Sequence, residues 1–338
     1  MNKSLLLYIS ASIYLFSFLV SCGGSDKANP NEESNVLSQP FLKAINDSIK
    51  QFPRNADLYS RRAVLLSRTD AHETANADYK KAWELNPTKE SALQYAANLA
   101  ILGQAAARLK LLQECITKFP DVPEFKRLTG ETYMEAGKSK LALELYDNLL
   151  KKDSLDFESL YEKGLLLEQM HDTPNAIAAL KKAYSLQPMN TYGLELAHMY
   201  AETKNPLALE ICDDVLSKDV VRELVDPFFI KGIYYSNLAQ YNLAVVQFDS
   251  CIKRDWKFTD AYIEKGIAYY KQKNYDEALS IFQLAATVSN SDADAYYWIG
   301  RCYEVVNKKE EAVAYYERAA TLDKNFTEAK DALKRLRK

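Results

Sequence analysis

Histidine and cysteine, the side chains that most often hold metals or act as nucleophiles, are few and widely spaced in this chain. His72, His171 and His198 have no cysteine or carboxylate at metal-ligand or catalytic spacing. The sequence also contains no phosphate-binding glycine-rich loop, nucleophile elbow or paired-carboxylate motif. We therefore expect no enzymatic activity, no metal site and no cofactor.

Cys22 differs from the other four cysteines because it ends an apolar segment. Lys3 precedes an apolar run over residues 5–20, and Leu19-Val20-Ser21-Cys22 is followed by two glycines. A membrane-spanning helix needs roughly 20 apolar residues, and this run is shorter. The segment resembles a bacterial lipoprotein signal peptide, occupying residues 1–21; a plain secretory signal and an N-terminal membrane helix are the alternatives.

The lipoprotein resemblance implies that Cys22 becomes the lipidated N-terminus, carrying palmitate or similar acyl chains in a membrane of the bacterial cell envelope. Gly23, rather than Asp, at the next position favours the outer membrane. Residues 22–40 are polar, without apolar periodicity, and are predicted to be a flexible tether. A tether of this length spans on the order of 20 to 25 Å.

The remaining composition is that of a folded helical protein. Of 338 residues, 48% are hydrophobic and 26% are charged, which excludes a disordered chain. The formal net charge of −3 gives no reason to expect nucleic acid as a partner. Ten glycines and ten prolines in this length, with no long alternation of apolar and polar residues, favour an all-α fold.

A pattern of large and small residues recurs about every 34 positions, and residues 259–290 show it most clearly. Tyr262, Gly266 and Tyr269 share one predicted helix, and Ala278 and Phe282 share the next. This helical hairpin resembles the tetratricopeptide repeat, which implies a right-handed superhelical α-solenoid in which each hairpin needs neighbours to bury its core. We expect about eight hairpins, a half-repeat at residues 41–53 and a C-terminal capping helix.

These expectations divide the solenoid, residues 41–338, into successive units. The predicted repeats are 56–89, 90–122, 123–156, 157–190, 191–224, 225–258, 259–292 and 293–326, followed by the cap at 327–338. Repeat five (191–224) is irregular, with an early Asn205-Pro206 and a long final connection. That irregularity predicts either a joint between two halves of the solenoid or a tolerated surface variation.

The other cysteines, Cys115, Cys212, Cys251 and Cys302, fall on predicted helices close to core positions. We predict that they are buried free thiols. Disulfides are disfavoured because these residues lie in separate repeats, one to six apart, and contacts in a solenoid run between neighbouring units.

The family resemblance implies a concave face lined by the second, fifth, ninth and twelfth places of each repeat. The candidate peptide-binding groove consists of Phe229, Ile233, Ile263, Ile267, Tyr270, Tyr297 and Arg301. An exposed apolar strip of this kind predicts a protein-interaction site, with Arg301 selecting an acidic neighbour. The alternative is that these residues pack on one another. The fifth and ninth places never pair Lys with Asn, which disfavours the family's clamp for C-terminal carboxylates.

The resulting functional hypothesis is a membrane-tethered protein–protein interaction scaffold of the cell envelope. It would bind a peptide or helix of an unidentified protein and contact the membrane through lipidated Cys22. Two alternatives stay open: a self-associating assembly lipoprotein, and an accessory subunit of an envelope enzyme or polysaccharide-handling complex. Homo-oligomerisation also stays open.

Overall fold

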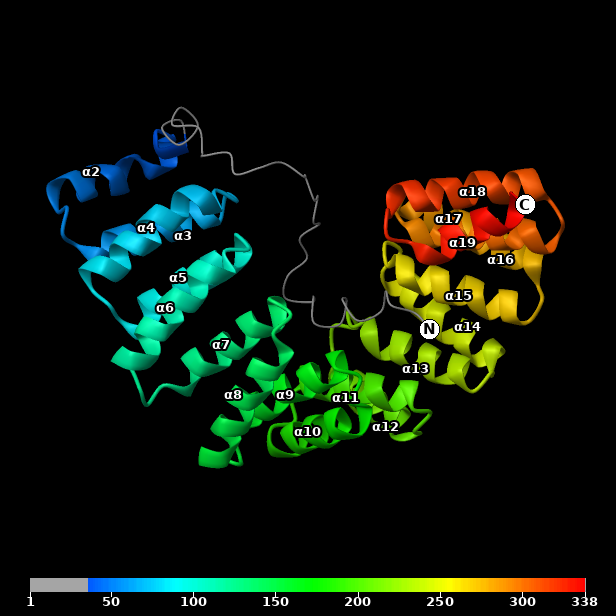
Figure 1. Ribbon diagram of the computed structural model, residues 1–338, viewed down its shortest axis with the longest axis horizontal. Helices are drawn as coiled ribbons and strands as arrows, with labels where there is room; N and C mark the ends of the chain where they lie inside the picture. Colours follow the sequence, from blue (N-terminus) through cyan, green and yellow to red (C-terminus); the bar gives the residue numbers. More distant parts are fainter. Residues whose placement is uncertain (1–35, 338) are drawn as a thin grey trace. The chain divides into compact units, whose positions relative to one another are not determined.

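The computed structural model describes residues 36–337, and all regular secondary structure in this part of the chain is helical (Figure 1). Cys22, the predicted signal peptide and most of the tether lie outside the described residues. The elements of the first part are η3 (Pro40–Leu42), α2 (Lys43–Gln51), α3 (Ala56–Ser67), α4 (His72–Leu85), α5 (Lys89–Ile101), α6 (Ala105–Lys118), α7 (Pro123–Glu135), α8 (Ser139–Lys152) and α9 (Phe157–Gln169). Those of the second part are α10 (Thr173–Leu186), α11 (Asn190–Glu202), α12 (Leu207–Lys218), α13 (Asp226–Asn237), α14 (Tyr241–Arg254), α15 (Thr259–Lys271), α16 (Tyr275–Val288), α17 (Ala293–Val305), α18 (Lys309–Leu322) and α19 (Thr327–Leu336).

The described residues divide into two compact units, 36–172 and 173–337. The boundary falls between α9 and α10, inside the predicted repeat four. Repeat five, where the sequence suggested either a joint or a surface variation, lies wholly within the second unit. As its sequence predicts, a short turn joins α11 to α12, and residues 219–225 form a longer connection to α13.

Each first helix of a hairpin ends in the same kind of turn. One residue in the left-handed backbone region follows every one of these helices, namely Asp70, Gly103, Gly137, His171, Lys204, Ala239, Lys273 and Asn307. In the hairpin of α15 and α16 the N–H of Lys273 donates to the carbonyl of Tyr270, and the N–H of Asn274 donates to the carbonyl of Tyr269, both at 3.0 Å. These bonds satisfy carbonyls that the end of a helix leaves open, so the chain reverses with little exposed backbone.

Within a hairpin, a glycine of the first helix lies against an aromatic ring of the second. The pairs are Gly130 with Tyr146, Gly232 with Phe248, Gly266 with Phe282, and Gly300 with Tyr316. All four rings are fully buried. Absence of a side chain on the first helix thus lets the two helices cross closely over one large apolar group.

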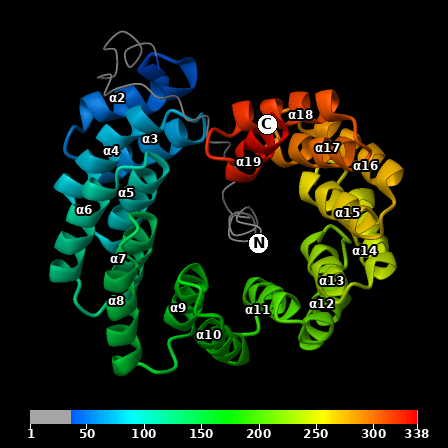
Figure 2. The ribbon, with the colours of Figure 1, turned by 45° about the vertical axis from the view of Figure 1, so that its right-hand side comes forward.

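The hairpins of each unit stack into two layers. In residues 173–337, α11 contacts α13, α13 contacts α15 and α15 contacts α17, so the first helices form one continuous layer. Figure 2 shows this layer on the inner side of the unit's curve, with α12, α14, α16 and α18 outside it. In residues 36–172, α7 likewise contacts α9. We call these surfaces the first-helix layers.

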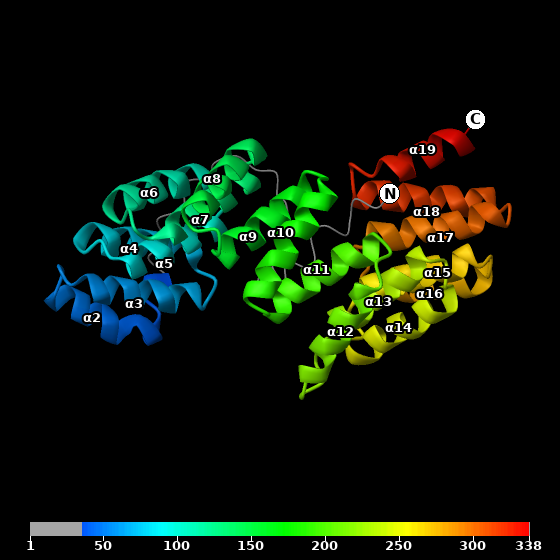
Figure 3. The same ribbon diagram turned by 90° about the horizontal axis from the view of Figure 1, so that it is seen from below.

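The ends of the stack are covered as expected. The half-repeat forms η3 and α2, and the buried residues there are Leu42 and Ile49. Phe41 is 49% exposed because the 3₁₀ turn directs its neighbour Leu42 inward. At the other end α19 continues the stack beyond α18 (Figure 3), and it buries Ala329 and Ala332.

The prediction for the four described cysteines is confirmed. Cys115, Cys212, Cys251 and Cys302 are all free and buried. Burial raises the pKa of Cys115, Cys212 and Cys302 to about 12. These thiols are therefore protonated at neutral pH and serve as small apolar core residues.

Candidate functional site on the first-helix layers

Four of the seven residues predicted to line a groove are buried. Phe229, Ile233, Ile263 and Ile267 are between 4% and 8% exposed. Ile263 and Ile267 share a core cluster with Phe282. The expectation of an exposed apolar strip is therefore not met at these four positions. Phe229 packs against Phe248 and Phe258, and the cluster around Ile263 and Ile267 includes residues of α16 and α17. At these four positions the structure agrees with the alternative expectation from the sequence, namely that the residues pack in the protein interior.

The other three predicted residues are half-buried and come together. Nη1 of Arg301 donates to the hydroxyl of Tyr297 at 3.0 Å, and Nη2 donates to the hydroxyl of Tyr270 at 3.4 Å. The guanidinium also lies 5.7 Å from the ring centroid of Trp298, within cation–π range. Arg301, Tyr270, Tyr297 and Trp298 form what we call the aromatic cradle; Trp298, at the sixth place of its repeat, was not among the predicted residues.

The cradle leaves the charge of Arg301 without a carboxylate partner. Arg301 forms no ion pair among the described residues. Burial alone would lower its pKa, but the hydrogen bonds to Tyr297 and Tyr270 outweigh burial and raise it. The nearby carboxylate Glu304 already accepts hydrogen bonds from Tyr316 and Arg335, each at 2.6 Å. The guanidinium is thus fixed in place and charged, with donor capacity remaining for an external acceptor.

A second feature of this layer is a column of acidic residues. They occupy the first turns of α13, α15, α17 and α19 at intervals of 34 residues, and they are Asp226, Asp260, Asp294 and Glu328. Acidic groups are favourable at helix N-termini. Burial, with the charge of Asp292, nevertheless raises the pKa of Asp260 and of Asp294 to about 6. None of these four residues was among the predicted site residues, although their spacing is visible in the printed sequence.

Glu264 lies one turn beyond Asp260 on α15 and is only 8% exposed. Among the described residues its carboxyl group has no hydrogen-bond donor and no ion-pair partner. Burial, reinforced by the charges of Asp260, Glu202 and Asp294, raises the pKa of Glu264 to about 8. This part of the layer therefore concentrates carboxyl groups around a buried one, with no cation to balance them.

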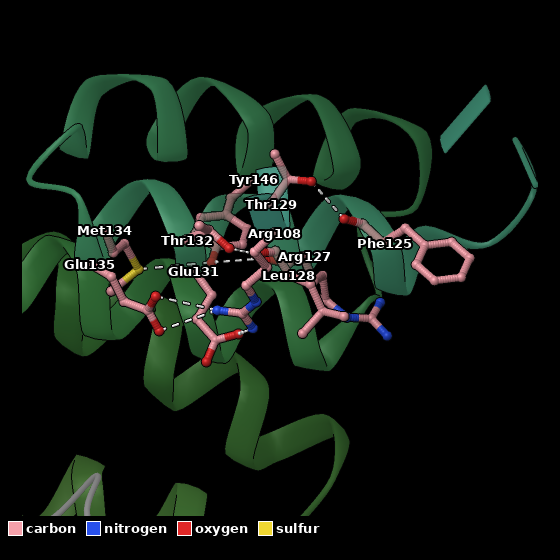
Figure 4. Close-up of polar contacts among 10 residues, drawn as sticks. All are labelled: Arg108, Phe125, Arg127, Leu128, Thr129, Glu131, Thr132, Met134, Glu135 and Tyr146. Atoms are coloured by element: carbon pink, nitrogen blue, oxygen red, sulfur yellow. Dashed lines mark hydrogen bonds and ion pairs between the residues drawn. The ribbon is translucent and has the colours of Figure 1, made fainter. Parts of the chain in front are cut away.

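In the first unit, several acidic residues form ion pairs with arginines. Arg108 of α6 is 3% exposed, and its guanidinium contacts Glu131 at 2.7 Å and Glu135 at 3.2 Å. Figure 4 shows both carboxylates directed at that guanidinium. Arg127 pairs with Asp156 at 3.2 Å and also with Glu158. Two arginines of the first unit thus pair with four of its carboxylates.

Glu162 is the counterpart of Glu264, since the two residues lie 102 positions apart, or three units of 34. Burial and the charge of Glu131 raise the pKa of Glu162 to about 7, while Arg127 acts in the opposite direction. Moving 102 positions from Arg127 leads to Phe229. The position that holds Arg127 in the first unit therefore holds a buried phenylalanine in the second unit.

Among residues 36–337, no group of three histidine, cysteine, aspartate or glutamate side chains is arranged to hold a metal ion. No helix within the same range has the length and apolar character needed to cross a membrane.

Comparison with known proteins supports the repeat assignment. Residues 127–190 and 263–325 match the family model for the tetratricopeptide repeat. The human mitochondrial import receptor subunit TOM70 is 29% identical over 161 residues, a match covering 44% of this chain but only 26% of TOM70. The chain thus corresponds to about a quarter of that relative.

Two solved structures share the fold. The hetero-tetramer Cut9–Hcn1 of the APC/C superposes with a TM-score of 0.56 and 17% identity, covering 91% of this chain and 59% of the other. A tetratricopeptide repeat protein from Parabacteroides merdae gives a TM-score of 0.51 and 15% identity, covering 84% and 99%. The described residues therefore have the all-α solenoid fold seen in tetratricopeptide repeat proteins, as the sequence predicted.

Proposed function

We propose that this protein is a membrane-tethered protein–protein interaction scaffold of the bacterial cell envelope. Lipidated Cys22 would hold it at a membrane, more specifically the outer membrane, and the first-helix layer of residues 173–337 would bind a segment of another protein. Tetratricopeptide repeats support the scaffold role. The matching relative is itself named as a receptor subunit, which agrees with protein recognition although only a quarter of it is matched.

The observation that carries the proposal is the unpaired guanidinium of Arg301 in the aromatic cradle. Two tyrosine hydroxyls hold the guanidinium in one position, so an incoming carboxylate meets an ordered donor rather than a mobile side chain. Tyrosine, tryptophan and arginine are also the residues enriched at the energetic centres of protein interfaces. An acidic side chain with an apolar neighbour is the segment that this cradle fits best.

The four buried groove residues have a supporting part in this proposal. Phe229 packs on Phe248 and Phe258 with ring centroids 5.8 and 5.1 Å apart. Ile263, Ile267 and Tyr270 share α15. We therefore assign Phe229, Ile233, Ile263 and Ile267 to the floor of the site, where they hold the contacting residues Tyr270, Tyr297 and Arg301.

Affinity purification from membranes tests this function. Protein carrying Arg301→Glu should lose its co-purifying partner, while Lys253→Glu, an exposed charge reversal on α14, should retain it. Cys22→Ala should move the protein out of the membrane fraction without changing its helical circular dichroism. Retention of the partner by Arg301→Glu would refute the site, and a partner that proves to be a second copy of this chain would favour the self-association alternative.

A further inference from the structure

We propose that the second unit also binds a basic side chain, the lysine or arginine of a partner segment, between Glu264, Asp260 and Asp294. This inference rests on the proposed function, because it assigns a second contact to the same bound segment. It concerns the carboxyl groups of α15 and the start of α17, which are distinct from the aromatic cradle.

The first reason is that Glu264 is buried and unpartnered. Burying a carboxyl group without a hydrogen-bond donor is costly, and proteins rarely leave such a group without a partner. The carboxylates of Asp260, Asp294 and Glu202 influence Glu264 electrostatically, yet no cation does. A basic side chain placed among them would supply donors to Glu264 and offset the mutual repulsion of the group.

The second reason is the internal comparison between the two units. Around Glu162 the chain provides its own cation, Arg127, which pairs with Asp156 and Glu158. At the corresponding position near Glu264 stands Phe229, which cannot provide charge. Two carboxyl groups are common to both places, since Glu158 and Glu162 lie 102 positions before Asp260 and Glu264. The cation that accompanies the first pair has no counterpart beside the second, so the missing charge is what a ligand would bring.

A metal ion fits this place less well than a basic side chain. No group of residues 36–337 meets the geometry for metal binding, and the column includes carboxyl groups on separate helices. A flexible ammonium or guanidinium group tolerates wider spacing than a coordinated ion.

The two contacts together constrain the partner's sequence. Asp294 and Arg301 lie seven residues apart on α17, which corresponds to about 10 Å along the helix axis. An extended segment rises about 3.3 Å per residue, so its basic and acidic side chains would be about three positions apart. In a helical segment bound parallel to α17 they would be about seven apart.

The experiment uses the full-length chain and an array of fluorescein-labelled 15-residue peptides on a leucine and serine background. Each peptide carries one arginine and one glutamate, separated by one to eight positions, and each has a twin in which uncharged citrulline replaces arginine. Fluorescence anisotropy at physiological salt gives the affinities. We expect the best peptides to bind at least tenfold more tightly than their citrulline twins.

Variants identify the site. Glu264→Gln and Asp260→Asn should each reduce the arginine-to-citrulline preference to about twofold or less, whereas Glu162→Gln, the counterpart with its own arginine, should leave the preference unchanged. Circular dichroism melting distinguishes a loss of binding from a loss of folding. Because Glu264→Gln and Asp260→Asn are both conservative, one of them still tests the site if the other fails to fold.

Each remaining outcome is decisive. Equal binding of arginine and citrulline peptides, with sensitivity to Arg301→Glu, would overturn this inference and leave the proposed function standing. Absence of binding by every peptide would overturn both. Calcium or spermidine could instead raise the melting temperature of the parent protein, but not that of Glu264→Gln, with no peptide present. That result would identify the ligand of this site as a small cation and not as a partner's basic side chain.

Discussion

Gly266 of α15 faces the ring of Phe282 on α16 so closely that a β-carbon added to the glycine would lie 2.5 Å from Cε1 of the phenylalanine. That separation is well inside van der Waals contact. The same relation recurs in three other hairpins, where the corresponding closest distances are 2.6 Å at Gly130, 2.4 Å at Gly232 and 2.8 Å at Gly300. Close crossing of the two helices in these hairpins therefore depends on a missing side chain.

Replacing Gly266 with alanine should destabilise the second unit. Phe282 is fully buried and cannot move away freely, so the extra methyl group should cost about 1–3 kcal/mol in the free energy of unfolding. The cost should exceed the gain in helix propensity of about 1 kcal/mol that alanine brings over glycine. Urea denaturation followed by circular dichroism measures the difference.

Two further variants make that test specific. Ser280→Ala, on the exposed side of α16, should change stability by less than about 0.5 kcal/mol. Adding Phe282→Leu to Gly266→Ala should recover part of the loss, because a smaller side chain makes room for the methyl group. Additive destabilisation by the two changes would contradict the close-crossing explanation.

Ala239, which follows α13, has a backbone φ of 56°. A β-carbon in the left-handed region costs roughly 1–2 kcal/mol relative to glycine. Changing Ala239 to glycine removes this cost, but part of the stability gained is offset by the greater freedom of glycine in the unfolded chain. We therefore expect Ala239→Gly to raise the free energy of unfolding by about 0.5–1 kcal/mol. Ala239→Val should lower it, and an unchanged midpoint in both variants would show that the turn is not held in this conformation.

Stability of the second unit should fall as the pH rises from about 4.5 to about 8. The pKa of Glu264 is raised by burial from 4.5 to about 8, so between these values the folded state holds a proton that the unfolded state has released. Rising pH therefore favours unfolding throughout this window. Asp260 and Asp294, with pKa values raised by burial from 3.8 to about 6, add to the decline at its lower end.

Glu264→Gln removes the largest contribution to this decline. The variant should be more stable than the parent at pH 8, by on the order of 2 kcal/mol, and the two should converge near pH 4.5. Glu328→Gln, an exposed member of the acidic column, serves as the control and should leave the profile unchanged. Parallel profiles for parent and Glu264→Gln would show that the carboxyl group is solvated.

The first unit offers a test of charge pairing at its N-terminal end. Nε of Arg62 contacts Asp78 at 2.6 Å, and their side chains are 15% and 7% exposed. Nη1 of Arg62 also donates to Asn46 of α2 at 2.8 Å, which ties the half-repeat to the first full hairpin. Asp78→Ala should cost about 3–5 kcal/mol, because it leaves a buried guanidinium without its counter-charge.

The double variant Asp78→Ala with Arg62→Met should recover much of that loss, since neither charge then remains buried. Asp47→Ala removes an exposed pair with Lys50 and should cost less than about 1 kcal/mol. A small effect of Asp78→Ala in thermal melts would indicate that water replaces the lost carboxylate.

The sequence predicted the hairpins well because their signals are local. Gly266, Phe282 and Ala285 recur at constant offsets, and the buried thiol of Cys115 occupies a small-residue position of the same pattern. Burial of Ile263 and Ile267 could not be predicted in this way, because it depends on how side chains of α16 and α17 pack around them. The position of a residue within its repeat identifies the helix face on which it lies. Packing of the surrounding helices determines whether that face is exposed to solvent.

Predicting which carboxylates of the first-helix layers are paired requires both the spacing of the sequence and the packing of the structure. Spacing alone could have identified the column that includes Asp260 and Asp294. Whether a carboxylate in the layer has its own cation depends on side chains from other elements, as Arg127 demonstrates with Asp156. The boundary after Asp172 had no signal, since repeat four matches the repeat pattern throughout.

Photo-crosslinking in native membranes tests the central claim most directly. A benzoylphenylalanine placed at Tyr270, in the first-helix layer, should crosslink to a partner protein, and the added Arg301→Glu change should abolish the product. The same probe at Leu284, which is 50% exposed on α16 of the opposite layer, should give no such product. A partner captured equally from both positions, or only from Leu284, would contradict recognition through the first-helix layer.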